Sequence, residues 1–296
     1  MKKIIVALIC LSPFLLSCNA QKNSSVVAEI NPFKYTSSKK VIAENGAVVS
    51  AHPLASKVGV VILKMGGNAV DAAIATQLAL AVVYPAAGNI GGGGFLVGRL
   101  SNGELISIDY REKAPGSASR DMYIDETGKA RTDLSQNGHL AGGVPGTVSG
   151  LFTSHQYAKL PFSKLIQPAI DLAEKGFAIT SGEARAFNSI QESLKKYNSV
   201  MPAFVKQTPW KEGDTLIQTD LANTLKRIQK NGAAGFYEGE TANLLVAEMK
   251  RGNGIISLED LKNYKAKPRT PQTFNYKGYK IVGMGMPSSG GLLMAQ

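Results

Sequence analysis

Cysteine, histidine and tryptophan are scarce in this sequence. Of its 296 residues, two are cysteine, three are histidine and one is tryptophan. Cys10 and Cys18 both lie near the N-terminus, so the rest of the chain can form no disulfide. The histidines have neither metal-ligand spacing nor partner cysteines: they are His52, His139 and His155. The composition therefore excludes a disulfide-stabilised scaffold, and we expect no metal site.

Acidic residues are too few to balance the basic ones. Lysine and arginine total 33 against 22 aspartate and glutamate, which gives a net charge of +11. The lysines are scattered, without the interleaved aromatic residues that a nucleic-acid groove uses. We therefore expect no nucleic-acid partner, and at most some attraction to anionic peptides.

The N-terminus has the pattern of a bacterial export signal. Two lysines precede an apolar run, residues 4–16, that is too short for a stable membrane span. Residues 15–18 read Leu-Leu-Ser-Cys and resemble a lipobox, in which Cys18 is acylated and becomes the mature N-terminus. Ordinary cleavage near Ala20 is the alternative.

These features predict three segments. Residues 1–18 form a lipoprotein signal peptide, and residues 19–42, which are polar with little periodicity, form a tether. Residues 43–296 form the folded domain. The expected location is the periplasm or cell envelope, with the membrane contacted only through the lipid anchor at Cys18.

Four consecutive glycines mark either a binding site or a crowded backbone crossing. Gly91–Gly94 has no side chains and is costly to order, so the run belongs where main chain passes close to something. Two strand-like runs follow, Phe95–Leu100 and Glu104–Tyr110, and the Asn102-Gly103 pair between them predicts a hairpin. Arg111 is therefore expected at the end of a strand, beside a glycine loop.

The sequence around Arg111 is compatible with two roles for this residue. Its planar guanidinium suits a carboxylate or phosphate, to which it can donate two parallel hydrogen bonds. Alternatively, Arg111 forms a solvated surface pair with Asp109 or Glu112. The glycine run enters a strand, and no Gly-Lys-Ser/Thr follows it, so a nucleotide or dinucleotide cofactor is not expected.

Turn residues and hydrophobic patterns predict the remaining elements. Asn68 is expected to cap a nearly all-apolar, buried helix, in whose first turn Asp71 meets free N–H groups. Predicted helices cover Pro53–Met65, Asn68–Tyr84, Thr147–Tyr157, Ser163–Lys175, Leu221–Lys230, Glu240–Arg251 and Leu258–Tyr264; predicted strands cover Gly46–Ser50, Thr273–Tyr276 and Tyr279–Met284.

Several motifs in a fixed order resemble the γ-glutamyltranspeptidase family, also called glutathione hydrolases. The resemblance extends from about residue 46 to residue 296. The motifs are Gly66-Gly-Asn-Ala-Val-Asp-Ala-Ala73, Pro85-Ala-Ala-Gly-Asn-Ile-Gly-Gly-Gly-Gly-Phe95, Arg111-Glu-Lys-Ala-Pro115, Gly143-Val-Pro-Gly-Thr147, Gln167-Pro-Ala-Ile-Asp-Leu-Ala173, Glu259-Asp-Leu261 and Pro287-Ser-Ser-Gly-Gly291.

The resemblance implies an α+β fold, the αββα sandwich of N-terminal-nucleophile hydrolases, of which this chain supplies an incomplete, large-subunit portion. It implies that Arg111 binds the α-carboxylate of a γ-glutamyl group. In the family a precursor cleaves itself, and the new N-terminal threonine forms a γ-glutamyl ester that is passed to water, an amino acid or a peptide. The implied partners are glutathione and other γ-glutamyl compounds, these acceptors, and a small subunit cut from the same precursor.

The catalytic threonine of the family is not found in this sequence. It lies in a Thr-His-x-Ser context, and no threonine directly precedes His52, His139 or His155. We therefore name no catalytic residue and expect residues 43–296 alone to turn over nothing. Ser288 and Ser289 are candidate hydroxyl donors, although Ser-Ser-Gly-Gly is also ordinary turn sequence. The alternatives are a related acylase and a non-catalytic envelope lipoprotein that binds γ-glutamyl peptides.

Overall fold

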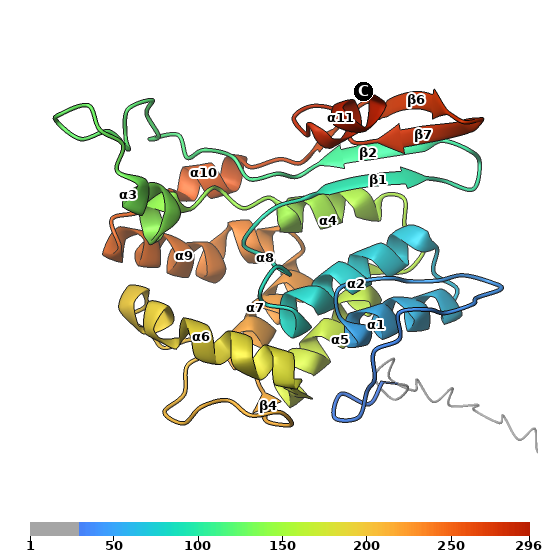
Figure 1. The fold of residues 1–296 in the computed structure, drawn as a ribbon, viewed down its shortest axis with the longest axis horizontal. Helices are drawn as coiled ribbons and strands as arrows, with labels where there is room; N and C mark the ends of the chain where they lie inside the picture. Colours follow the sequence, from blue (N-terminus) through green and yellow to red (C-terminus); the bar gives the residue numbers. More distant parts are fainter. Residues whose placement is uncertain (1–29) are drawn as a thin grey trace, which may run out of the picture.

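A computed structural model of the protein describes residues 30–296. The predicted signal peptide, Cys18 and the first part of the predicted tether lie outside the described residues. The described chain is a mixed α+β structure in which a small sheet and a hairpin lie along one side of a group of helices (Figure 1).

The hairpin that carries Arg111 forms as predicted. Strand β1 (Phe95–Arg99) pairs antiparallel with β2 (Leu105–Asp109), and the register places Phe95 opposite Asp109. The short β5 (Lys267–Pro268) adds to the other edge of β2. Because β2 is the central strand, its residues from Ile106 onward are buried, and the strand holds the residues that follow it in a fixed place.

Four helices form the centre of the hydrophobic core. Helix α1 (Pro53–Lys64) packs on α2 (Ala69–Val83), α2 packs on α5 (Phe162–Lys175), and α5 packs on α7 (Thr219–Asn231). Helix α2 is buried on nearly all sides, as its apolar sequence predicts, because α1, α5 and α4 (Thr147–His155) surround it.

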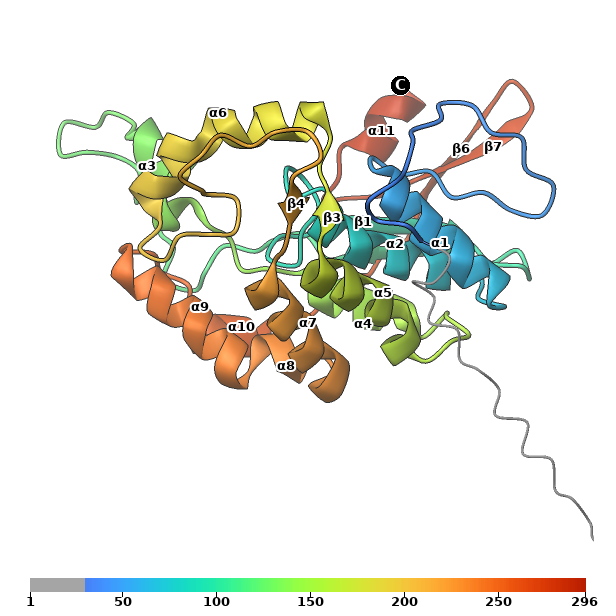
Figure 2. The same ribbon diagram turned by 90° about the horizontal axis from the view of Figure 1, so that it is seen from below.

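Four further helices form a lobe to one side of this core (Figure 1). Helix α6 (Ser181–Tyr197) has no counterpart among the sequence predictions and begins with a capping box between Thr180 and Glu183. The short strands β3 (Phe177–Ala178) and β4 (Thr215–Leu216) pair antiparallel and connect α6 to the core (Figure 2). The other elements of the lobe are α8 (Ala234–Tyr237), α9 (Gly239–Arg251) and α10 (Leu258–Asn263).

Two further segments lie at the sheet side of the molecule. A long excursion after β2 contains α3 (Thr132–Gln136) and η2 (His139–Ala141) and leads into α4. Near the C-terminal end, the predicted hairpin forms as β6 (Gln272–Tyr276) and β7 (Tyr279–Gly283), followed by α11 (Gly290–Ala295).

The segment before α1 differs from the prediction in one respect. Residues 46–50, predicted as a strand, form none, and Val49 is 92% exposed. Ile30 is buried, the Pro32 carbonyl accepts from the Ala178 N–H, and Tyr35 donates its hydroxyl to the Ala178 carbonyl. The first described residues of the predicted tether therefore contact the folded body.

In residues 30–296, no helix is long and apolar enough to cross a membrane.

Candidate functional site

Arg111 lies directly after β2, with its backbone fixed on both sides. Its N–H donates to Asp109 Oδ1 over 3.1 Å, and its carbonyl accepts from the Tyr264 hydroxyl over 2.7 Å. Its guanidinium makes no hydrogen bond or ion pair within the described residues, and the residue is exposed. A fixed backbone with a free guanidinium is the arrangement expected of a residue that binds an anion from outside the chain.

The surface-pair interpretation of Arg111 is wrong. The buried carboxylate of Asp109 is paired with Arg269, whose Nε and Nη2 donate to Oδ2 over 3.1 and 2.8 Å. Arg269 is itself held by its backbone N–H, which donates to the Ser107 carbonyl beside β5. Because Arg269 neutralises Asp109, that carboxylate does not compete for the Arg111 guanidinium, and within the described residues Glu112 forms no ion pair with it either.

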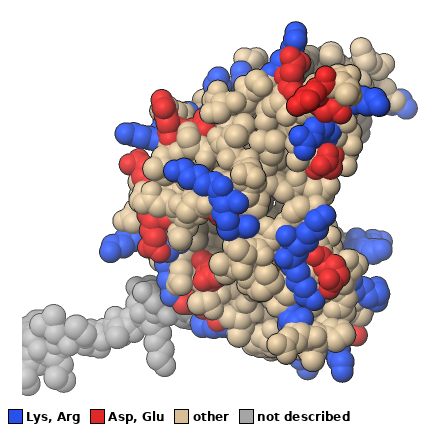
Figure 3. Space-filling model, turned by 90° about the vertical axis from the view of Figure 1, so that its left-hand side faces the viewer, with Lys and Arg blue, Asp and Glu red and all other residues tan. Residues whose placement is uncertain are grey.

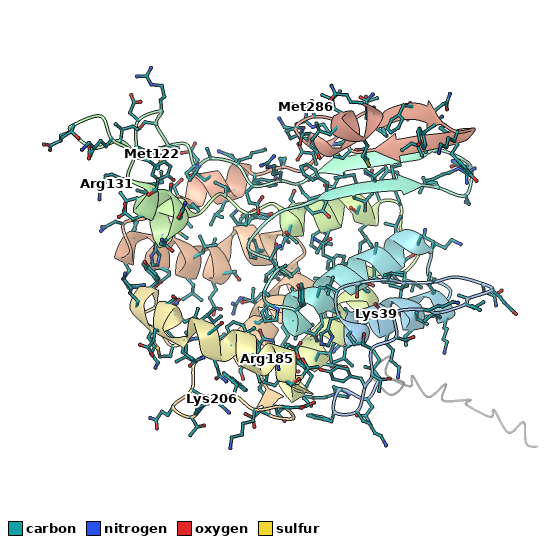
Figure 4. All side chains as sticks on the ribbon, viewed as in Figure 1. Lys39, Met122, Arg131, Arg185, Lys206 and Met286 are labelled. Carbon is teal, nitrogen blue, oxygen red and sulfur yellow. The ribbon has the colours of Figure 1, made fainter. Side chains whose placement is uncertain are left out.

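Arg111 contributes to one wall of an open pocket with a volume of about 590 Å³. Residues 111–115 form that wall, residues 118, 119, 122 and 123 form the second and residues 140–143 form the third. Met122, on the second wall, lies beside α3 (Figure 4). The Tyr123 hydroxyl joins the second and third walls by donating to the Leu140 carbonyl over 2.9 Å.

The glycine run is a crowded crossing of backbones next to this pocket. A Cβ on Gly93 would lie 2.5 Å from the Tyr110 carbonyl oxygen, and one on Gly94 would lie 2.8 Å from the Tyr110 ring. The Gly92 carbonyl accepts from the N–H groups of Gly146 and Thr147 over 2.7 and 3.0 Å. The run therefore connects the motif that contains it with the motif at residues 143–147. Side chains at Gly93 or Gly94 would displace Tyr110 and the backbone that leads to Arg111.

Two tyrosines from the helical lobe hold the backbone around the site. Tyr264 donates to Arg111, and its ring stacks on that of Tyr237 with the planes 4° apart. Tyr237 donates its hydroxyl to the Pro145 carbonyl over 3.0 Å and accepts from the Ser149 N–H. Burial raises the pKa of both phenols, and negative charge on Asp109 and Glu112 raises that of Tyr264 further. Both hydroxyls therefore stay protonated and remain donors.

Basic groups gather at the same end of β2. Lys113 lies above the Tyr264 ring, 4.5 Å from its centroid, and donates to the Lys265 carbonyl. Burial lowers the pKa of the Lys113 ammonium, and the nearby charge of Lys267 lowers it further.

On the side of the molecule where α3 and the C-terminal end of α9 lie, Figure 3 shows basic and acidic side chains interspersed on a surface that is hollowed near its middle.

The other residues considered from sequence do not belong to the Arg111 pocket. Ser288 and Ser289 do not line it, and the Ser288 hydroxyl accepts from the Gly290 N–H. His52 caps α1, and the His155 ring nitrogen bonds the Leu160 carbonyl. In residues 30–296, no three histidine, cysteine or acidic side chains lie close enough to hold a metal ion.

Sequence reasoning missed the residues that reach the site from far along the chain. Tyr264 lies 153 residues after Arg111, and Arg269 lies 160 residues after Asp109. Neither residue belongs to a motif with a recognisable spacing from its partner, so no signal in the sequence alone indicates the contact.

Comparisons with known proteins agree on one family. The family model for gamma-glutamyltranspeptidase matches residues 55–296. A glutathione hydrolase proenzyme of a Pseudomonas species is 47% identical over 257 residues, which are 86% of this chain and 45% of that protein. Another Pseudomonas protein, named acylase ACY 1 proenzyme, is 37% identical over 87% of this chain and 48% of its own length. The chain thus spans about half the length of these relatives.

A solved structure extends this agreement to the fold. The gamma-glutamyltranspeptidase of Helicobacter pylori superposes with a TM-score of 0.84 at 47% identity, covering 86% of this chain and 74% of that chain. The predicted fold class, the α+β fold of N-terminal-nucleophile hydrolases, is thereby confirmed. With Arg111 at a strand end, the glycine crossing beside it and a family match over most of its length, the chain belongs to the γ-glutamyltranspeptidase family.

Proposed function

We propose that this chain is the large-subunit part of a γ-glutamyltransferase, or glutathione hydrolase, precursor. In the proposed reaction, the hydroxyl of a threonine that becomes N-terminal by self-cleavage attacks the γ-glutamyl amide carbon. The α-amine of that threonine accepts the hydroxyl proton and returns a proton to the leaving amine. The resulting γ-glutamyl ester is then cleaved by water, or by the amino group of an amino acid or peptide, which restores the threonine.

In this proposal, Arg111 binds the α-carboxylate of the γ-glutamyl donor. One observation carries this assignment: its guanidinium has no partner in the described residues, while its backbone is held by Asp109 and Tyr264. A guanidinium that needs no rearrangement can donate two parallel hydrogen bonds to an incoming carboxylate. Lys113 and Lys267 add positive charge on the same side, which favours an anionic donor such as glutathione.

The proposed partner is the small subunit from the same precursor. A cavity of about 1090 Å³ lies along α1, α2 and residues 44–50, and the buried hydroxyl of Thr76, one of its lining residues, has no hydrogen-bond partner within the described residues. Apolar side chains of α11 and the preceding turn are also exposed, among them Met286, Leu293 and Met294. An uncovered cavity and exposed apolar side chains support a second polypeptide that packs here.

The proposed location is the periplasm or cell envelope, with a lipid anchor at Cys18. The supporting observations are the basic and apolar leader, the Leu-Leu-Ser-Cys sequence at residues 15–18, and the absence of cysteine after Cys18.

Kinetics of Arg111 variants test the donor site. In the complete precursor, Arg111→Lys and Arg111→Gln should raise KM for glutathione by about 10- to 100-fold, because the bound carboxylate loses its bidentate partner. Arg120→Gln is the matched control, since Arg120 is close to the second wall in sequence but does not line the pocket, and its side chain is 91% exposed and paired with Asp121. Its KM should not change.

Kinetics, donor competition and calorimetry together separate the alternatives. Unchanged KM in both Arg111 variants would refute the donor-site assignment. The acylase alternative, supported by the 37% identity to ACY 1 proenzyme, predicts that glutaryl amides compete successfully with glutathione as donors. A non-catalytic binding protein predicts binding of glutathione in calorimetry without any turnover by the complete protein.

A further inference from the structure

A histidine outside the γ-glutamyl motifs holds the third wall of the Arg111 pocket. His139 begins the 3-10 helix η2, and the residues directly after it, 140–143, line the pocket. Its Nε2 lies 2.7 Å from Glu248 Oε1 and 3.3 Å from an Arg251 Nη2, both on α9. The His139 side chain is 13% exposed, so this contact with α9 is largely shielded from water.

The α9 end of this contact is itself well fixed. Arg251 pairs with Glu248 and also donates from Nη2 to the Tyr197 carbonyl at the end of α6 over 3.0 Å. Hydrogen bonding from Arg251 lowers the pKa of Glu248 to about 2, and the His139 contact contributes to that shift. Glu248 is therefore ionised near neutral pH and presents an acceptor to His139.

Backbone packing leaves little room for the imidazole to move. The His139 ring lies so close to Gly252 that a Cβ there would overlap with it, and a Cβ on Gly254 would lie 3.0 Å from the His139 backbone oxygen. The Gly142 N–H donates to that same His139 oxygen. The position of the His139 ring against α9 therefore determines the position of Leu140, the first residue of the third wall.

The wall is joined to the arginine strand at its other end. Val144 and Lys113 exchange both backbone hydrogen bonds, with lengths of 2.8 and 3.2 Å. Residues 140–143 are thus held between the His139 contact on one side and the segment after β2 that contains Arg111 and Lys113 on the other. Tyr123 adds the bond to Leu140 that connects the second wall.

We propose that His139 is a positioning residue for donor binding: through Glu248 it holds residues 140–143 at the distance from Arg111 that the γ-glutamyl group requires. This inference rests on the proposed donor site at Arg111. His139 does not touch the donor. It acts by limiting the width of the pocket, so its loss should weaken donor binding and leave the chemical step unchanged.

Steady-state kinetics of the complete precursor test the proposal with glutathione as donor. His139→Ala and Glu248→Gln should each raise KM by about 3- to 30-fold while kcat stays within about twofold of the parent. His139→Gln should restore most of the affinity, because its amide nitrogen can replace Nε2 opposite Glu248. His155→Gln is the control, since His155 contacts the Leu160 carbonyl and does not line the pocket.

Hydrogen exchange of the same variants supplies a readout that does not depend on activity. The amides of residues 140–143 should exchange faster in His139→Ala than in the parent, while those of α5 should not change. Unaltered exchange at 140–143, or unaltered KM in both His139→Ala and Glu248→Gln, would overturn the proposal. If Arg111→Gln also leaves KM unchanged, the donor site has failed, and exchange alone decides whether His139 holds the wall. If His139→Ala does not fold, Glu248→Gln, at a side chain 40% exposed, carries the test.

Discussion

Asp71 is a structural rather than a chemical residue. It is completely buried, and its carboxylate accepts hydrogen bonds from the N–H groups of Asn68, Lys159 and Leu160. The sequence predicted the cap on α2. The contact with residues 159 and 160, nearly 90 positions later, could not be predicted because no local pattern encodes it.

Replacing Asp71 should therefore destabilise the protein without a specific effect on donor affinity. Asp71→Asn retains one acceptor oxygen and turns an NH₂ group toward backbone donors, which should lower the free energy of unfolding by about 2–4 kcal/mol. Urea unfolding of the complete protein measures the change. Asp121→Asn, at a side chain 61% exposed, is the control and should shift it by at most about 0.5 kcal/mol.

Single residues of the site differ in how far the sequence reveals them. Arg111 could be found because it follows a hairpin with a clear turn and lies in a short motif. Tyr264, Arg269 and His139 could not, because each acts through a partner more than 100 residues away. Long-range side-chain contacts are a property of the tertiary fold, and one sequence alone does not contain their pairing.

At the level of elements, the glycine run shows that the backbone packed beside a loop can determine which residues fit in that loop. Gly93→Ala should destabilise the hairpin by about 1–3 kcal/mol, because its Cβ would lie 2.5 Å from the Tyr110 oxygen and 2.7 Å from the Glu112 nitrogen. It should also raise KM for glutathione by displacing residues 110–112. The same substitution at Gly91, where a Cβ would meet nothing within 4 Å, is the matched control. Equal unfolding midpoints for the two variants would contradict this explanation.

The predicted elements differ in how well they agree with the structure. The strongly apolar α1 and α2 and the turn-bounded hairpin were confirmed because local pattern and tertiary packing favour the same structure. Helix α6 was missed although the capping box of Thr180 and Glu183 is a recognisable start signal; its buried residues are Ala184 and Phe187. The strand predicted at residues 46–50 was wrong because its apolar residues have no pairing strand in the part of the chain that the structure describes.

At the scale of the whole molecule, the intact masses of the native protein from envelope fractions test the proposed organisation. We expect a chain that starts at an acylated Cys18, paired with a second, smaller polypeptide that starts at threonine. The physical reason is that the cavity along α1 and α2 and the apolar α11 need a covering partner. A single chain without an acyl group and without an associated polypeptide would contradict both the anchor and the two-subunit organisation.

The hydrogen bond from Tyr264 to Arg111 also constrains the order of folding. The two residues are 153 positions apart, so the backbone at Arg111 gains this hydrogen bond only when the helical lobe has folded against it. Closing so long a loop is entropically unfavourable and slow compared with forming the local hairpin. The hairpin can therefore form early as a local unit, whereas the arginine reaches its final position late, when nearly all of residues 30–296 are already in place.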